Sequence, residues 1–463
     1  QQHQIRFDKF EFVSINQLEI KKSIYDHSRV TIKGRVRKKN IEDYQAHLEQ
    51  KDPAITITYN NDDRKVLFKG IIDDYKFKHK NYDYYLELKA VSYSVLLERV
   101  KPNRIFQNQG TTYTDVFSKL NSDNEQFHIS FADSAVGNSP LVSADYPLVL
   151  QYKESEWDFI KRLSSYLQQI VIVDDTKDNS ETINIQAGPH TVKSKDLNNV
   201  SGMQSRKIGA KNTIYNYCKV EGHEHHRSDN IFGLGTKVNY KLNNESEDTV
   251  ELVIIKNRIH LEDEVLCSDL TLVQEGDINL VKEKRKTPIA GRSFRAEVKK
   301  LNNAYQAKVQ FMDIEDEFAE GKAHWFPIDR LYTDAYFAPE VGDVVDVYFK
   351  NKNERHAIVK NVSTDGGKKV DNVPTDKVIM TPSGHKVKIN EETVIISAKE
   401  EKAIVEITEE KINVTKKDNQ VTIDEETINL QTKKGAVNMD KSVTELSLGS
   451  KKVEISNSGI NLV

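Results

Sequence analysis

The last quarter of the chain carries a short repeat that limits its fold more strongly than any other feature. After Pro382, ten pairs of apolar residues follow one another, and a single residue separates the members of each pair. Because side chains two positions apart lie on the same face of a β-strand, each pair predicts a short strand with one apolar face. The pairs are Val387/Ile389, Val394/Ile396, Val405/Ile407, Ile412/Val414, Val421/Ile423, Ile428/Leu430, Val437/Met439, Leu446/Leu448, Val453/Ile455 and Ile460/Leu462.

This repeat predicts a solenoid-like stack of strands whose core one chain lacks the volume to fill. The chain has 17 Phe, 19 Tyr and 2 Trp, but none of these aromatic residues follows Phe349. Aromatic side chains normally supply much of a core because each buries a large area. We therefore expect three chains to wind together, with the first nine pairs, from Val387 to Ile455, at a common axis. Ten strands at about 4.8 Å spacing would form a rod of roughly 50 Å.

Two other folds remain compatible with the repeat. An ordinary antiparallel β-sandwich and a single-chain β-helix also consist of strands with an apolar face. A sandwich would need aromatic residues and longer strands, so the pattern favours an intertwined trimeric β-helix over residues 383–463. We call this segment the needle.

Two segments precede the needle. Residues 363–382 contain adjacent glycines, two prolines and no sustained periodicity, which predicts a linker. Residues 288–362 contain short alternating stretches, among them 307–311 and 344–349, which predict an OB-like barrel. OB barrels often bind nucleic acid through basic grooves with aromatic residues. Here acidic residues that repel phosphate lie near the aromatics, so we expect no nucleic-acid partner; they are Asp313, Glu315, Asp316, Glu317, Glu320 and Asp329.

Residues 1–287 predict a β-rich base with a few helices. Helices are expected over residues 154–169 and 111–120, where apolar residues recur at helical spacing. Ser155 followed by Asp158 resembles a capping box at the start of the first of these helices. Strands are expected at 55–59, 82–91 and 250–255. A base, a barrel and a needle agree with the roughly 150 residues per domain that the length of 463 residues suggests.

The composition excludes several classes of protein. With 67 Lys and Arg against 71 Asp and Glu, the net charge of −4 argues against a nucleic-acid coat or a polybasic membrane anchor. No apolar run approaches the ~18 residues of a membrane span. Cys218 and Cys267 are too few for a disulfide scaffold. No Sec signal is recognisable after Gln1, so any export is expected to use another machine.

Several segments resemble, in order, the motifs of the VgrG family, the spike proteins of type VI secretion and related contractile injection systems. The longest is LVLQYKESEWDFIKRLSSYL at residues 148–167, where the family has a Gln-Tyr-x-Glu run before an aromatic-rich helix. The others are AKVQF (307–311), HWFPID (324–329), PEVGDVVDVYF (339–349), HAIVKNV (356–362) and TPSGHKVKIN (381–390). The tryptophan pattern of the family's barrel is reduced here to Trp325.

The resemblance implies a trimeric phage tail-hub-like base, an OB neck and a β-needle. It also implies an inner-tube protein at the base, baseplate proteins, effector cargo and a PAAR-like protein at the tip. Such a spike is assembled in the bacterial cytoplasm and then injected. A type VI system, an extracellular injection particle and a phage tail all remain open as the machine concerned.

The last residues are the expected docking site for the tip protein. Exposed aliphatic groups and unpaired strand edges favour aggregation and are normally covered. We therefore expect contacts through Ser458, Gly459, Ile460, Asn461, Leu462 and Val463. A frayed, unoccupied terminus is the alternative.

Candidate chemistry is sparse, and no cofactor is expected. His223, His225 and His226 form the one histidine cluster of the sequence, but their spacing is not that of a zinc helix motif. The segment Ser-Gly-His at 383–385 lacks the strand–turn–helix context of a nucleophile. We therefore favour a mechanical, non-enzymatic spike. The competing hypothesis is a cell-wall or polysaccharide hydrolase that carries a β-helix.

Overall fold

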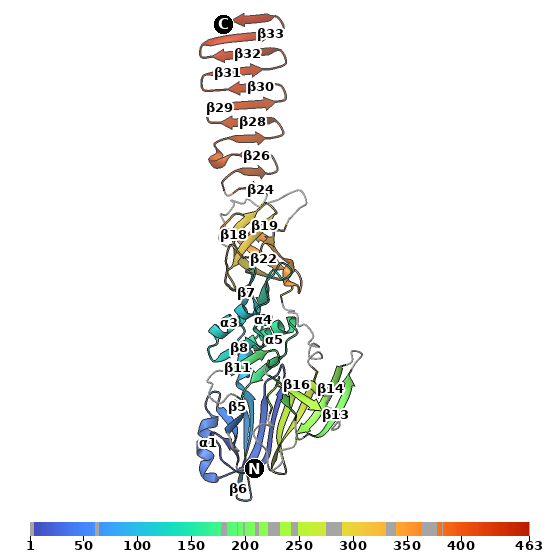
Figure 1. Ribbon diagram of the computed structural model, residues 1–463. Helices are drawn as coiled ribbons and strands as arrows, with labels where there is room; N and C mark the ends of the chain where they lie inside the picture. The colour runs from blue at the N-terminus through green and yellow to red at the C-terminus, as the bar shows by residue number, and fades with distance from the viewer. Residues whose placement is uncertain are drawn as a thin grey trace. The chain divides into compact units, whose positions relative to one another are not determined.

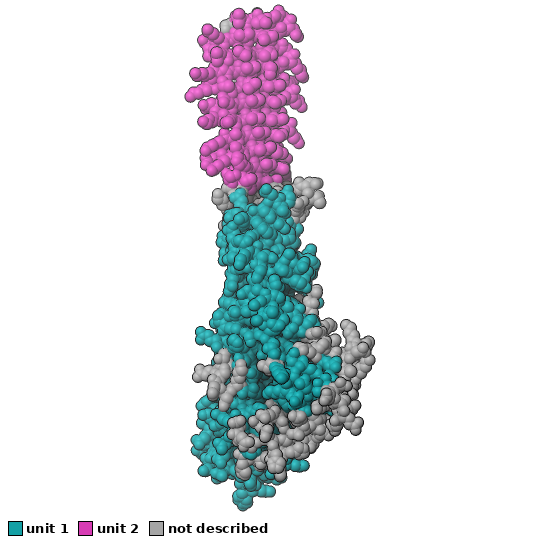
Figure 2. All heavy atoms as spheres, in the orientation of Figure 1, with its two compact units in different colours: residues 1–361 teal, residues 362–463 magenta. Residues whose placement is uncertain are grey.

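The computed structural model shows a mainly β protein, as predicted. It describes residues 4–60, 64–176, 183–191, 193–197, 200–208, 213–220, 232–241, 249–274, 289–329, 339–362, 377–381 and 383–462. The chain divides into two compact units, residues 1–361 and 362–463, which Figure 2 shows in different colours.

A large, mainly antiparallel sheet forms the base (Figure 1). Its main path runs β1-β4-β5-β6-β3-β2-β16-β17-β14-β13, with β15 paired to β16 and β12 to β15. Alternating burial explains the strands, since Val30, Ile32 and Val36 of β3 all face the core. The strands are β1 (Ile5–Phe7), β2 (Phe12–Ser23), β3 (Arg29–Val36), β4 (Ala54–Asn60), β5 (Arg64–Lys80), β6 (Asp83–Ser92), β12 (Lys195–Asp196), β13 (Val200–Ile208), β14 (Thr213–Val220), β15 (Lys237–Lys241), β16 (Thr249–Glu262) and β17 (Val265–Val273).

Both helices predicted from periodicity are present and capped. α5 (Glu156–Tyr166) begins after Ser155, whose hydroxyl accepts a hydrogen bond from the Asp158 N–H at 3.1 Å. α3 (Tyr113–Asp123) has a complete capping box between Thr112 and Asp115. Both helices contribute to one apolar core with the small sheet β10-β11-β8, whose strands are β8 (Phe127–Phe131), β10 (Val171–Asp174) and β11 (Ile183–Ala187). Shorter helices that the periodicity did not reveal are α1 (Ile41–Leu48), α2 (Leu96–Arg99) and α4 (Ser134–Gly137).

The predicted barrel is present as a five-stranded sheet in the order β21-β19-β18-β22-β23. A parallel bridge between Ile328 and Val359 joins its two edges, and the Asp329 N–H donates to the Val359 carbonyl at 2.7 Å. This contact closes the sheet. The strands are β18 (Arg292–Asn302), β19 (Gln306–Phe311), β21 (Phe326–Pro327), β22 (Val344–Phe349) and β23 (Ala357–Val362).

The second unit contains one antiparallel sheet in which every strand pairs with its neighbours in sequence, as the ladder in Figure 1 shows. Its eleven strands include every predicted pair. Within residues 377–381 and 383–462 all strands belong to this single layer, so the sandwich alternative is wrong for one chain. The strands are β24 (Lys377–Met380), β25 (Lys386–Ile389), β26 (Val394–Ser397), β27 (Ile404–Ile407), β28 (Lys411–Lys416), β29 (Asn419–Asp424), β30 (Ile428–Gln431), β31 (Gly435–Met439), β32 (Val443–Leu448), β33 (Lys451–Ser456) and β34 (Gly459–Leu462).

The expected linker, residues 363–382, needs correction at its end. Its residues 363–376 and 382 lie outside the described part, but β24 lies within it and pairs with β25. Between these strands, Gly384 has a positive φ of 90° and donates its N–H to the Thr381 carbonyl at 2.8 Å. The end of the expected linker, from Lys377, is therefore the first strand of the needle sheet.

Base and barrel share part of one core. Ile105, Leu148 and Leu150 of the base pack with the apolar side chains of the barrel strands. A small sheet also crosses the expected domain boundary, because β20 (Glu315–Asp316) pairs with β7 (Arg104–Phe106), which pairs in turn with β9 (Val149–Gln151). The two parts are thus one unit, although the sequence suggested two domains.

Buried arginines bind the two parts together. Arg104, on β7, forms ion pairs with Glu156 of α5 at 2.9 Å and with Glu315 of β20 at 3.2 Å. Arg162, also on α5, has a side chain only 2% exposed and pairs with Glu154 at 3.0 Å and with Glu354 at 3.6 Å. Each arginine therefore contacts carboxylates from both the base and the barrel.

We expect Arg162→Met to destabilise residues 1–361 by about 3–5 kcal/mol, because Glu154 and Glu354 would lose their buried cation. Arg99→Met is the matched control, since Arg99 pairs with Asp52 at the surface and should contribute about 1 kcal/mol or less. Tryptophan fluorescence during chemical unfolding reports on this unit alone, because the needle has no tryptophan. Equal shifts for the two variants would contradict the proposed role of the buried pair.

Candidate functional surfaces

The needle sheet carries two columns of side chains on one face, and all but one of their residues are apolar. Cross-strand pairing places Ile412 opposite Ile423 and Ile423 opposite Ile428, and the same relation holds from β25 to β34. The first column contains Val387, Ile396, Val405, Val414, Val421, Leu430, Val437, Leu446, Val453 and Leu462. The second contains Ile389, Val394, Ile407, Ile412, Ile423, Ile428, Met439, Thr444, Ile455 and Ile460. We call this side the apolar face.

One residue of the predicted needle core lies outside the columns. Leu448 was grouped with Leu446, but the register pairs it with Gly435, and Thr444 takes its place opposite Met439. Leu448 is accordingly 62% exposed. The face of β32 was predicted correctly. The two residues of β32 that lie in the columns are Thr444 and Leu446, whereas the predicted pair, Leu446/Leu448, lies two residues further along the strand.

One chain leaves the apolar face uncovered. None of the apolar side chains described beyond Val362 is buried, and Ile423, near the middle of the second column, is 39% exposed. Exposed apolar area of this extent is unusual unless another surface covers it. The opposite face carries mainly polar residues along its centre, where the Thr422 hydroxyl donates to Asn413 Oδ1 at 2.9 Å. The two faces therefore differ as an oligomer interface and a solvent face would.

The last strand presents an open edge. β34 pairs with β33 on one side, and no described strand pairs with its other side. Ile460 and Leu462 in this strand are 68% and 82% exposed. Of the predicted docking residues, Val463 lies outside the described part.

A serine, a histidine and a glutamate approach one another in the base as in a hydrolase, but the arrangement is structural. The Ser94 hydroxyl lies 2.7 Å from His27 Nδ1, and His27 Nε2 lies 3.1 Å from Glu98. Burial lowers the pKa of His27, while the hydrogen bond that its imidazole donates to Glu98 opposes this effect. Ser94 is fully buried, so a substrate cannot reach its hydroxyl.

Of the other sequence candidates, those within the described residues have structural roles. The segment 383–385 forms the turn before β25, with the Ser383 hydroxyl hydrogen-bonded to that of Thr381 at 2.8 Å. His223, His225 and His226 lie outside the described residues. Among the acidic residues of the barrel, Asp313 has a structural partner, since it pairs with Arg295 at 2.9 Å.

Asp316 is the most perturbed of these acids. Burial raises its pKa to about 6, although hydrogen bonds from the Phe311 N–H and from Gln107 oppose the shift. Its carboxylate holds the barrel strand β19 to the segment after β7, which is a structural role.

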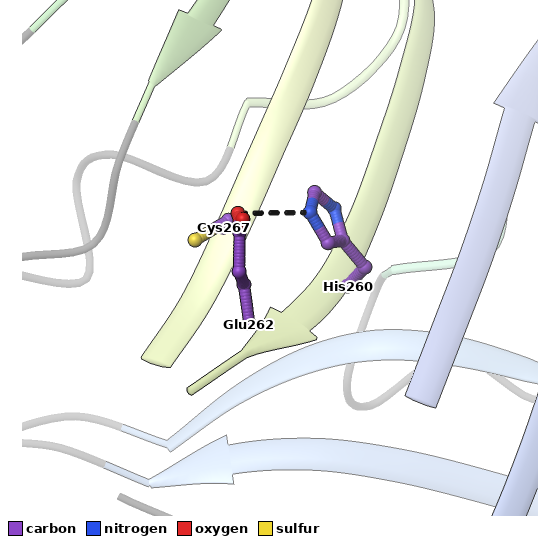
Figure 3. A group of neighbouring side chains, drawn as sticks. All are labelled: His260, Glu262 and Cys267. Atoms are coloured by element: carbon purple, nitrogen blue, oxygen red, sulfur yellow. Dashed lines mark ion pairs between the residues drawn. The ribbon is translucent and has the colours of Figure 1, made fainter. Parts of the chain in front are cut away.

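The structure also brings together a group that the sequence analysis missed. His260 and Glu262 on β16 and Cys267 on β17 lie within 4.8 Å of one another by their donor atoms (Figure 3). They meet because His260 is directly opposite Cys267 across a hairpin whose turn is Asp263 and Glu264. The signal in the sequence was His-x-Glu followed by a polar two-residue turn and a cysteine.

Comparison with solved structures identifies the fold. The structure of the E. coli c3393 protein, a type VI secretion component similar to the bacteriophage T4 tail proteins gp27 and gp5, aligns with a TM-score of 0.53 and 12% identity, covering 78% of this chain and all of that one. A chain of the half-lidded Francisella PdpA–VgrG complex aligns with a TM-score of 0.50 and 9% identity, covering 99% of this chain and 87% of that one. The chain has the fold of a VgrG-like spike and tail hub.

This agreement is one of structure and not of close sequence. No protein-family model matches the chain, and no curated protein matches it. The lidless PdpA–VgrG structure also aligns with a TM-score of 0.50, at 10% identity and over 97% of this chain and 93% of that one. The VgrG resemblance read from six short motifs is thus confirmed at the level of the fold.

Proposed function

We propose that this protein is a non-enzymatic, homotrimeric spike that punctures cells as part of a contractile injection machine. The observation that carries the proposal is the uncovered apolar face of the needle sheet. The likeness of fold to c3393 and to a chain of the Francisella PdpA–VgrG complex supports a place at the tip of a tail-like tube.

The dimensions of the needle strands fit three chains around one axis. Strands of four to six residues, such as β25 and β28, span roughly 13–20 Å at about 3.3 Å per residue. Three walls of this width place each sheet about 4–6 Å from the axis, close to half of the ~10 Å that separates packed sheets. Val and Ile side chains fill such a space, whereas aromatic rings would overfill it.

The remaining partners follow from the same likeness. The base would meet the inner-tube protein and the baseplate, and the likeness to the PdpA–VgrG complex supports carriage of an effector. The spike would be assembled in the bacterial cytoplasm and leave with the machine. Of the helices in the described part of the chain, none is long and apolar enough to cross a membrane. No observation favours the hydrolase alternative.

The full chain should have a solution mass of about three times its 53.1 kDa monomer mass. Burial of three apolar faces drives this association, since each fully buried aliphatic side chain contributes about 1.5–3 kcal/mol. Light scattering coupled to size-exclusion chromatography measures the mass. A monomer or a dimer with an intact needle would overturn the trimeric architecture.

A charge in the second column should prevent trimer formation. Ile423→Asp would bring three carboxylates together in an apolar seam, at a cost of several kcal/mol per trimer. Thr422→Asp is the matched control, because Thr422 lies on the opposite face and its replacement disturbs only hydrogen bonds with Asn413 and Gln420, each worth about 1 kcal/mol. Light scattering of both variants gives the answer. Equal loss of trimer would show that the wrong face has been assigned to the axis.

We also propose that a separate tip protein of the PAAR type binds at Ser458, Gly459, Ile460, Asn461, Leu462 and Val463. The open edge of β34 offers backbone hydrogen bonds, and the exposed Ile460 and Leu462 offer apolar contact. Three such strands around an axis would form a small flat platform.

Deletion of residues 459–463 should abolish capture of a PAAR-type protein encoded beside this chain. The trimer should survive, because the shortened needle keeps eight of its nine core pairs fully paired, and light scattering checks this point. Leu448→Ser is the control, since Leu448 is also exposed but lies on β32, away from the open edge. Capture that is unchanged by the deletion would rule out this docking site.

A further inference from the structure

The end of the β16–β17 hairpin holds a set of donor atoms that the proposed spike function does not use. His260 Nε2 lies 3.7 Å from Glu262 Oε2, and the Cys267 sulfur lies within 4.8 Å of both residues' donor atoms. In a tetrahedral zinc site, bonds of about 2.0–2.3 Å place the ligand atoms roughly 3.3–3.8 Å apart. Small side-chain rotations would therefore bring all three donors to one ion.

We propose that His260, Glu262 and Cys267 bind a borderline divalent cation of the Zn²⁺ class. Thiolate and imidazole together select Zn²⁺ or Co²⁺ over Mg²⁺ and Ca²⁺, which prefer oxygen ligands alone. Three protein ligands leave the fourth position to water or to a donor from outside this chain. Binding releases the thiol proton of Cys267 and requires a neutral imidazole at Nε2.

A neighbouring carboxylate is placed to orient the imidazole. His260 Nδ1 is buried without a hydrogen-bond partner, and Asp269 Oδ2 lies 3.8 Å from it. With Nε2 on the metal, Nδ1 carries a proton, and this N–H would donate a hydrogen bond to Asp269. Metal-bound histidines commonly make such a bond to a carboxylate. Asp269 is therefore a positioning residue.

The positive charge of the nearby Arg258 is neutralised by carboxylates, so it does not oppose binding of a cation. Arg258 lies on the same strand face two residues before His260, but it pairs with Glu19 at 2.6 Å and with Asp269 at 3.2 Å. The short hairpin fixes the register of His260 and Cys267, so the donors are held together by backbone pairing before any ion binds.

Cobalt titration of the untagged, chelator-treated full chain tests the proposal. We expect one Co²⁺ per chain with a thiolate-to-metal charge-transfer band in the near ultraviolet, lost on addition of Zn²⁺. Cys267→Ser should abolish the band, and His260→Gln should lower Co²⁺ affinity at least about tenfold. Asp269→Asn should keep the band but weaken binding by about 10–100-fold, the range for outer-shell partners.

Two controls separate this site from other donors in the chain. Cys218→Ser should leave the band unchanged, since Cys218 is the other cysteine of the sequence. The triple variant His223→Ala, His225→Ala and His226→Ala should also keep it. Circular dichroism confirms that each variant is folded; should Cys267→Ser fail to fold, His260→Gln decides alone. Absence of the band in the folded wild-type chain, its survival in folded Cys267→Ser, or unchanged Co²⁺ affinity of folded His260→Gln would overturn the assignment.

Discussion

Two apolar columns on one face of the needle sheet are the feature on which the assembly of this protein depends. The backbone groups of β25 to β33 form their hydrogen bonds within the chain, so these strands need no second chain to pair with. The aliphatic side chains remain half exposed, and only another surface can bury them. The strand register decides which face is apolar, because a slip of one residue would turn all the aliphatic side chains of a strand to the opposite face.

The motif most typical of the family, residues 148–167, has a structural role in this molecule. Arg162 and Glu156 of α5 are buried, and they contact charged groups of both the base and the barrel. A buried charge without its partner is costly, so each residue of such a set requires the others. The packing of base against barrel is thus sufficient to explain the charged residues of this motif.

Local patterns in the sequence predicted most of the fold. They could not predict contacts between segments that are far apart in the sequence. Alternation and capping signals are local, so the needle strands, α3 and α5 were found. α1 was missed because only Tyr44 and Leu48 mark its buried side. The packing of Ile105 into the barrel core, the position of Leu448 and the meeting of His260 with Cys267 all depend on which strands become neighbours.

The polar side of the needle explains how a long open sheet avoids pairing with the wrong surface. Its central line runs through Lys388, Ile395, Glu406, Asn413, Thr422, Asn429, Asn438, Glu445, Glu454 and Asn461, nine of them polar. Charged residues along this face disfavour packing of one needle against another through it. The Val, Ile and Leu side chains of the apolar face favour packing through that face. Only one face is apolar, so the proposed trimer turns that face inward, and its closed ring of three chains leaves none of the face exposed.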